Sequence, residues 1–172
     1  MPPNFYDWTG VYIGGNVGYG TGSISDSATS STQSFSGLIA GGQIGANLQY
    51  RNVLFGVEVD CDWTNQQGSG TSLTASMSWL ATARMRLGFA YDNISYYATG
   101  GAGYTRFASG PIGGAASSSA RTAWVAGLGQ ESAINRNLIL RIEVLYLQLL
   151  GGTPTSAVSS ADKVYDVVAR LD

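Results

Sequence analysis

The residues most able to do chemistry form a short acidic series, Glu58, Asp60 and Asp62, at a spacing of two. In a β-strand, residues two apart point to the same face, so this spacing places three carboxylates side by side. Neighbouring carboxylates can serve as acid and base in catalysis. Charges at matching positions in other segments extend this set, which we predict to line one enclosed face: Glu58, Asp60, Asp62, Arg84, Arg86, Glu131, Arg141, Glu143, Asp166 and Arg170.

Six acids and four arginines on one face favour a structural network over catalysis. Charges enclosed in a narrow interior must be paired, and arginine pairs with carboxylates through two parallel hydrogen bonds. We therefore predict an ion-pair and hydrogen-bond network. A functional variant of this network is a gate, in which pairs that exchange partners open a thin water path for ions. Acid–base chemistry by Glu58 and Asp60 is the catalytic alternative.

The rest of the chain offers few groups for catalysis or metal binding. It contains no histidine, so no nucleophile has the partner that the commonest hydrolases use. Cys61 is the single cysteine, which argues against a disulfide framework and a zinc cluster, and we expect it to be a small apolar surface residue. The glycine-rich residues 14–18 lie inside a strand pattern, which argues against a nucleotide site. We predict no enzymatic activity, no catalytic residue, no metal site and no cofactor.

The elements that position these charges are strands, because apolar residues recur at every second position in eight segments. The clearest is residues 53–63, where Val57 and Val59 alternate with Glu58 and Asp60. One face of each segment is apolar and the other is small, polar or charged. The predicted strands are residues 8–19, 38–50, 53–63, 72–91, 94–107, 121–133, 140–146 and from 164 onward.

The connections between these strands alternate in length, as in an antiparallel barrel with short turns at one end and long loops at the other. A strand in hydrocarbon cannot leave backbone groups unpaired, so such a sheet must close. We predict an all-β fold, a single domain of residues 1–172 that forms an eight-stranded antiparallel up-and-down transmembrane β-barrel with both termini on the periplasmic, short-turn side. The short turns contain Arg51-Asn52, Asp92-Asn93 and Arg136-Asn137, and the predicted loops are residues 21–36, 65–71, 108–119 and 150–162.

Composition favours a wall that faces lipid. Charged residues make up 12% of the chain, about half the share in a soluble globular domain. A net charge of −2 offers no basic surface, so no nucleic-acid partner is predicted. No run of about 18 uncharged apolar residues occurs, which excludes a membrane-spanning helix. The first residues lack the pattern of a signal peptide, which has been removed if the protein is exported. Outer-membrane lipid is the predicted partner.

Aromatic residues gather near the ends of the predicted strands. Amphipathic rings at such positions suit the two membrane interfaces, where each ring meets the lipid headgroups. Tyr12, by contrast, is expected to point inward, beside glycines that leave room for it. The predicted interfacial aromatic residues are Trp8, Tyr19, Tyr50, Trp63, Tyr91, Tyr96, Tyr104 and Tyr146.

Several segments, in order along almost the whole chain, are similar to one family. Residues 8–20, WTGVYIGGNVGYG, resemble the opening strand of the small porin-like outer-membrane β-barrel proteins of alphaproteobacteria, the outer-membrane immunogenic protein type. The resemblance implies a place in the outer membrane of a Gram-negative cell envelope. Similar segments follow at residues 41–45, 55–60, 80–88, 97–101 and 141–146.

Two features depart from the family pattern. Members usually end in a strand that closes on a terminal aromatic residue, whereas this sequence ends in Leu171-Asp172. Either a few residues follow in the full protein, or the barrel assembles by another route. Gln130 and Ser132 lie on the face assigned to lipid, so we expect them near the interface or against another protein.

Three functions remain open at this point. The first is a structural outer-membrane barrel that supports the envelope, presents surface loops and is at most a narrow pore for small solutes. The second is a membrane-embedded adaptor or subunit that binds another membrane or envelope protein through its loops or its lipid-facing wall. The third, a soluble lipocalin-like carrier, requires an apolar interior and a polar exterior, the reverse of this assignment.

Overall fold

The protein folds as an antiparallel β-sheet, seen in a computed structural model that describes residues 6–26, 31–69, 73–111, 117–150 and 159–171. Side chains are described for residues 6–21, 36–65, 79–106, 120–148 and 150. Within these ranges, no helix is long and apolar enough to cross a membrane. The strands are β1 (Gly10–Asp26), β2 (Ser31–Tyr50), β3 (Val53–Ser69), β4 (Leu73–Tyr91), β5 (Ile94–Pro111), β6 (Ser117–Ala133), β7 (Leu138–Leu150) and β8 (Ser159–Leu171).

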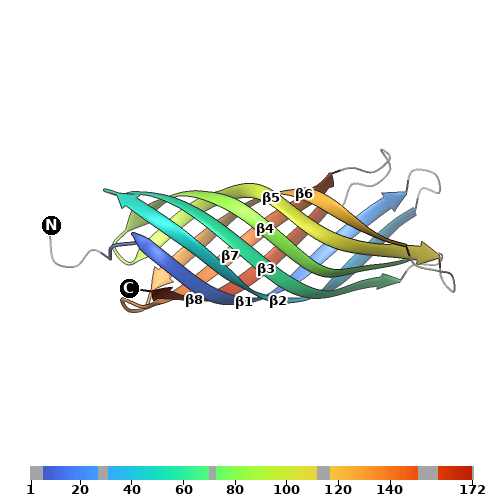
Figure 1. Ribbon diagram of the computed structural model, residues 1–172, viewed down its shortest axis with the longest axis horizontal. Coiled ribbons are helices and arrows are strands. Elements are labelled where there is room, and N and C mark those ends of the chain that lie inside the picture. Colours follow the sequence, from blue (N-terminus) through green and yellow to red (C-terminus); the bar gives the residue numbers. More distant parts are fainter. Residues whose placement is uncertain (1–5, 27–30, 70–72, 112–116, 151–158, 172) are drawn as a thin grey trace.

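Each strand pairs with the next along the chain, and β8 pairs back with β1, so the hydrogen-bonded sheet is a closed barrel (Figure 1). All of these pairings are antiparallel. The predicted all-β, antiparallel, up-and-down fold is confirmed. Because every strand of the closed sheet has two neighbours, its backbone groups can pair on both sides.

The strands are longer than the sequence pattern predicts, so the predicted bounds of the long loops are wrong. Most of residues 21–36, predicted as a loop, belongs to the ladder between β1 and β2, which runs to the pair Asp26 and Ser31. Alternation of apolar and polar residues is needed only where the two faces of a sheet meet different surroundings. Beyond that level the backbone ladder can continue without the pattern. The remaining connections, 27–30, 70–72, 112–116 and 151–158, lie outside the described residues.

Short connections join the strands at the other end, where β1 begins and β8 ends (Figure 1). Arg51 and Asp92 have φ angles of 56° and 55°, each at the first position of a two-residue turn. A positive φ at this position matches the twist of a hairpin. Asn52 ties its turn to β4 by donating a side-chain hydrogen bond to the Ala90 carbonyl oxygen at 3.0 Å. The third connection, 134–137, is longer but also lies at this end.

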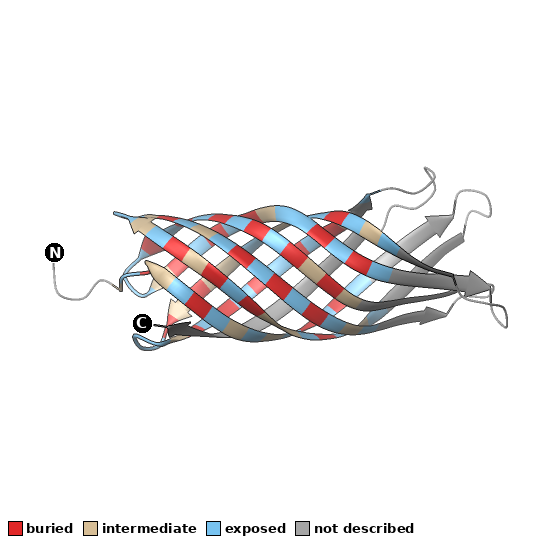
Figure 2. Ribbon diagram, viewed as in Figure 1, coloured by how far each residue is buried: buried red, intermediate tan, exposed pale blue. Residues whose placement is uncertain are grey.

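The two faces of the barrel have opposite character, as the alternation of exposed and buried residues along the described parts of β1 to β7 shows (Figure 2). The outside carries large apolar side chains, such as Met85, which is 73% exposed. The inside carries charged side chains, such as Arg141, which is 1% exposed. This distribution is the reverse of what a soluble lipocalin-like carrier requires.

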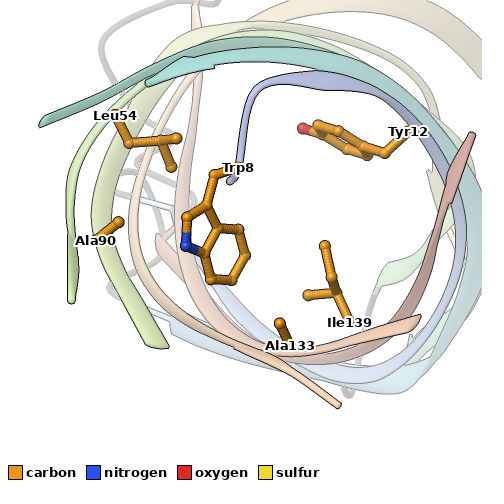
Figure 3. Packing of buried hydrophobic residues seen from close by; sticks show 6 residues of the cluster. All are labelled: Trp8, Tyr12, Leu54, Ala90, Ala133 and Ile139. Carbon is orange, nitrogen blue, oxygen red and sulfur yellow. The ribbon is translucent and has the colours of Figure 1, made fainter. Parts of the chain in front are cut away.

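Trp8 lies inside the barrel. The prediction that it lies at the membrane interface is therefore wrong. It is 3% exposed and packs at the short-turn end among Tyr12, Leu54, Ala90, Ala133 and Ile139 (Figure 3). The alternation of inward and outward side chains along a strand does not apply to Trp8, because β1 begins only at Gly10. Gly10 has a φ of 148°, a value that side-chain-bearing residues rarely adopt, so a glycine is required where the chain enters the strand. The Trp8 backbone N–H also donates to Gln49 Oε1 at 2.9 Å.

Fluorescence quenching from the lipid phase can test this position of Trp8. We expect brominated acyl chains to quench Trp63, which is 68% exposed on the outer face, and to leave Trp8 unquenched. The measurement uses two variants in lipid vesicles, each retaining only one of these tryptophans, with the others replaced by phenylalanine. Equal quenching of both tryptophans would contradict the buried position.

Candidate functional site

Glu58 on β3 is the centre of a buried cluster of charges that we call the lumen network. Its two carboxylate oxygens accept hydrogen bonds from Arg84 Nη2 at 2.7 Å, Arg141 Nη1 at 2.7 Å and the Tyr12 hydroxyl at 2.6 Å. Arg86 Nη1 lies 3.7 Å from Glu58 Oε2. Glu58 therefore binds groups from three other strands. The lumen network consists of Glu58, Asp60, Arg84, Arg86, Glu131, Arg141 and Glu143, all at most 5% exposed.

Glu131 on β6 joins the same arginines from the other side of the barrel. It accepts hydrogen bonds from Arg86 Nη2 at 2.7 Å and from Arg141 Nε at 2.8 Å. Glu131 and Arg141 are direct partners in the ladder between β6 and β7, which brings their side chains together. The hydroxyl of Ser95 donates a third, longer hydrogen bond at 3.3 Å. Glu58 and Glu131 thus share Arg86 and Arg141.

Arg84 on β4 binds three carboxylates at once. Besides Glu58, it donates from Nη1 to Glu143 at 2.8 Å and from Nε to Asp60 at 3.1 Å. Glu143 also accepts a hydrogen bond of 2.9 Å from the Tyr97 hydroxyl. Charge-assisted hydrogen bonds of this kind are the strong ones in proteins. The network therefore connects strands β3, β4 and β7 across the interior.

Two tyrosines complete the network, and sequence reasoning missed one of them. Arg86 Cζ lies 3.7 Å from the centre of the Tyr97 ring and 5.8 Å from that of Tyr12, within range of cation–π attraction. Tyr97 could have been found from its position in the strand, since it alternates in phase with polar Ser95 and Thr99.

Glycines of neighbouring strands make room for these rings. A Cβ atom at Gly45 would overlap the Tyr12 hydroxyl, and one at Gly129 would overlap the Tyr97 ring. The glycine that makes room for Tyr12 is therefore Gly45 of β2, rather than one of residues 14–18.

Asp60 and Asp62 form the upper part of the described interior, on the side away from the short turns. Asn16 Nδ2 donates to Asp62 Oδ1 at 2.8 Å and to Gln43 Oε1 at 3.2 Å. Asp60 Oδ2 accepts hydrogen bonds from Arg84 and from the Thr82 hydroxyl. We call Asn16, Gln43, Asp60 and Asp62 the aspartate cluster. Strands β4, β6 and β7 contribute an apolar patch to the interior: Leu80, Ala123, Val125, Leu145 and Leu147.

The remaining predicted network residues, Asp166 and Arg170, lie on β8, whose side chains are outside the described residues. In the backbone ladder, Asp166 pairs with Arg141 on one side and Asn16 on the other. Cys61 is exposed on the outer face. Among the described residues, no three His, Cys, Asp or Glu side chains are grouped in a way that could hold a metal ion.

Aromatic side chains line the outer wall at two levels. Near the short turns lie Tyr50, Tyr91 and Tyr96, which are all exposed. Toward the other end, Trp79 packs against Tyr104 with ring centres 5.7 Å apart, and Trp124 packs against Tyr146 at 5.2 Å. The interfacial aromatic residues predicted from the sequence did not include Trp79 and Trp124, although both alternate in phase with the outward residues of their strands. Exposed Tyr19 and Trp63 also lie on the outer face.

Gln130 and Ser132 lie on the outer face close to the short turns. Both are half-buried, and in the ladder Gln130 pairs with Tyr96 while Ser132 pairs with Ile94. Ser132 is the second-last residue of β6. Gln130 and Ser132 therefore lie at the same height along the barrel axis as Tyr50, Tyr91 and Tyr96.

The chain that forms this barrel, with its apolar wall and charged interior, matches a known protein family over nearly its whole length. The family model described as "Outer membrane protein beta-barrel domain" matches residues 2–165. The chain belongs to this outer-membrane β-barrel family. The 31 kDa outer-membrane immunogenic protein of Brucella melitensis, a relative, is 32% identical over 177 residues, which cover 86% of this chain and 74% of the relative. The predicted resemblance to outer-membrane immunogenic proteins of alphaproteobacteria is confirmed.

Solved structures of other outer-membrane barrels share the fold. Neisserial surface protein A has a TM-score of 0.61 at 15% identity, over 95% of this chain and 98% of that one. Ail, the attachment invasion locus protein of Yersinia pestis, has a TM-score of 0.59 at 12% identity, over 95% of this chain and 99% of that one. The outer-membrane β-barrel family therefore accounts for both the sequence and the architecture, and it places this protein in the outer membrane.

Proposed function

We propose that this protein is a structural barrel of the outer membrane, in which eight strands close around an interior filled by side chains. The observation that supports this most directly is the opposite character of the two faces. Large apolar side chains cover the outside, and paired charges fill the inside. Eight strands enclose an interior just wide enough for side chains, so the barrel is at most a narrow path for small solutes.

The two levels of outer aromatic residues support a transmembrane orientation. Rings at the two borders of an apolar wall suit the headgroup regions of a bilayer. We assign Tyr50, Tyr91 and Tyr96 to the periplasmic border, because short turns of outer-membrane barrels face the periplasm. Both chain ends then face the periplasm, and Gln130 and Ser132 lie at that border. This position accounts for their polarity without a partner protein.

The lumen network supports a structural role rather than catalysis. Glu58 and Asp60, the pair considered for acid–base chemistry, are both 2% exposed and both bind Arg84. A substrate would have to displace these ion pairs to reach either carboxylate. The network instead joins strands across the interior, where ion pairs and hydrogen bonds between buried charges favour one arrangement of the strands.

Labelling from the lipid phase tests this proposal. A photoreactive probe dissolved in the membrane should label Val57, Val59, Met85 and Val144, which are exposed on the outside, and should spare Glu58, Arg84 and Glu143. Mass spectrometry of the protein folded in lipid vesicles gives the label at each position. Labelling of the charged set, or solubility of the folded protein as a monomer without detergent, would overturn the transmembrane assignment.

A second candidate function is the presentation of a binding surface outside the cell. Strand β1 continues from Tyr19 at the outer wall to Asp26, and β2 begins at Ser31. At about 3.3 Å per residue, seven further residues extend a strand by roughly 20 Å. The barrel would then project beyond the membrane, as a platform for its surface loops. To test this role, binding to host-cell surfaces is measured for whole cells that express the protein and for cells in which residues 27–30 and 112–116 of the protein are replaced.

A further inference from the structure

We propose that the aspartate cluster binds a hard, oxygen-preferring cation, with Ca²⁺ as the reference ion, between the side chains of Asp60, Asp62, Asn16 and Gln43. This site goes beyond the structural role proposed above. The outer-membrane assignment does not depend on it, since it rests on the outer wall and on the family.

The charge balance of the interior is the first argument. Within the described residues, five buried acids face three buried arginines, and half-buried Arg121 adds a fourth positive charge, so negative charge is in excess. The buried arginines form their ion pairs mainly with the carboxylates nearer the short turns, since Arg86 and Arg141 bind Glu58 and Glu131. Arg84 reaches Asp60 but also binds two glutamates. Buried charges without a partner are costly, so the excess calls for positive charge.

The excess negative charge of the interior is localised at Asp62. This carboxylate is 7% exposed, and no Arg or Lys forms an ion pair with it in the described part of the chain. Its described hydrogen-bond partner is the Asn16 amide, and the carboxylate of Asp60, two positions earlier on β3, faces the same interior. Two ionised carboxylates can only accept hydrogen bonds, so they do not satisfy each other. A cation bound between the two carboxylates would compensate the charge of both.

Two buried oxygen atoms give independent evidence for a missing ligand. Asp60 Oδ1 and Asn16 Oδ1 are both inaccessible to solvent and have no hydrogen-bond partner among the described atoms. Asp60 itself is 98% buried, since its exposed fraction is 2%. Buried acceptors without a donor are rare in native proteins and call for a water or an ion. Asn16 donates to Asp62, and Asp60 is the neighbour of Asp62 on the same face of β3.

The donor set determines the class of cation. Carboxylate oxygens and amide oxygens, without nitrogen or sulfur, are the ligands of hard cations, and Ca²⁺ accepts such mixed sets in flexible geometry. Two carboxylates match the charge of one divalent ion. Gly41 lies opposite Asp62 in the ladder, and a Cβ atom there would overlap Asp62 Oδ1, so the glycine leaves the carboxylate its position.

Calorimetric titration of the detergent-folded full chain with CaCl₂ tests the proposal. We expect saturable binding of one Ca²⁺ and a rise in Tm of about 5 °C at saturating Ca²⁺ relative to EDTA. Choline chloride at matched ionic strength is the salt control. Asp62→Asn should abolish both effects, and Asp92→Asn, the same change at an exposed turn whose positive φ suits asparagine, should keep both.

Asn16→Ala provides a second variant if Asp62→Asn does not fold, with Ca²⁺ binding expected to be weakened about tenfold or more. The proposal is overturned if the wild-type protein shows no saturable binding, or if both variants bind as the wild type does. In the first case a shared proton or a water occupies the aspartate cluster, and in the second the ion binds elsewhere. Lipid-phase labelling of the outer wall would be unchanged in either case, so failure of this site is distinguishable from failure of the transmembrane assignment.

Discussion

Glu58→Gln is expected to lower the free energy of unfolding by about 3–5 kcal/mol, the range seen when one partner of a buried ion pair is removed. The substitution keeps the shape of the side chain but removes its charge. Arg86 would then keep Glu131 as its acidic partner among the described residues, and Arg84 and Arg141 would each lose one carboxylate. The destabilisation comes from buried positive charges that lose one of their counterions.

Urea unfolding in lipid vesicles, followed by tryptophan fluorescence, measures this effect. Asp62→Asn is the matched control, because it makes the same chemical change in the same interior at a carboxylate without an ion pair in the described structure. In EDTA, Asp62→Asn should change the free energy of unfolding by less than about 1 kcal/mol. Equal destabilisation by the two variants would show that the ion pairs of Glu58 contribute nothing specific to stability.

Gly101→Ala is expected to lower the free energy of unfolding toward the upper end of the 1–3 kcal/mol range, about 3 kcal/mol, that overpacking costs. A Cβ atom at Gly101 would overlap the Ala83 carbonyl oxygen and lie 2.7 Å from Arg84 Cα. These are backbone atoms of the neighbouring strand, which cannot move aside as a flexible side chain can. Relief of the clash would displace β4 at the residue that binds three carboxylates of the lumen network.

Gly100→Ala is the control for this substitution. Its Cβ atom would meet the Val125 carbonyl oxygen at 3.7 Å, an ordinary contact. We expect a change of no more than about 0.5 kcal/mol, as at most surface sites. The same urea titration measures both variants, and a Gly100→Ala variant as unstable as Gly101→Ala would show that loss of glycine flexibility, rather than the close approach of the strands, is responsible.

Much of the barrel was predictable because the side-chain period of a strand is a local property of the backbone. Val57, Glu58 and Val59 alternate between the two faces wherever the strand lies, so the apolar wall and the charged interior follow from the spacing of residues alone. The turns at Arg51 and Asp92 were predictable for the same reason, since each interrupts the alternation. The limits of the strands were not, because the backbone ladder from Thr21 to Asp26 continues where no pattern marks it.

The contacts within the site depend on which residues face each other across the interior, and this is not a local property. Arg141 and Glu58 are 83 positions apart and meet only because the strands close and stagger around the lumen. The same closure places Trp8 inside the barrel and gives each arginine its carboxylates. It also leaves Asp62 without an ion pair among the described residues.

The sequence by itself therefore determined the strands, their apolar and charged faces, and the family, because these follow from residue type and spacing along one chain. Only the tertiary structure decided the partners of each buried charge and the place of the aspartate cluster. Those depend on the register of eight strands around a common axis, and register couples residues that no local pattern connects.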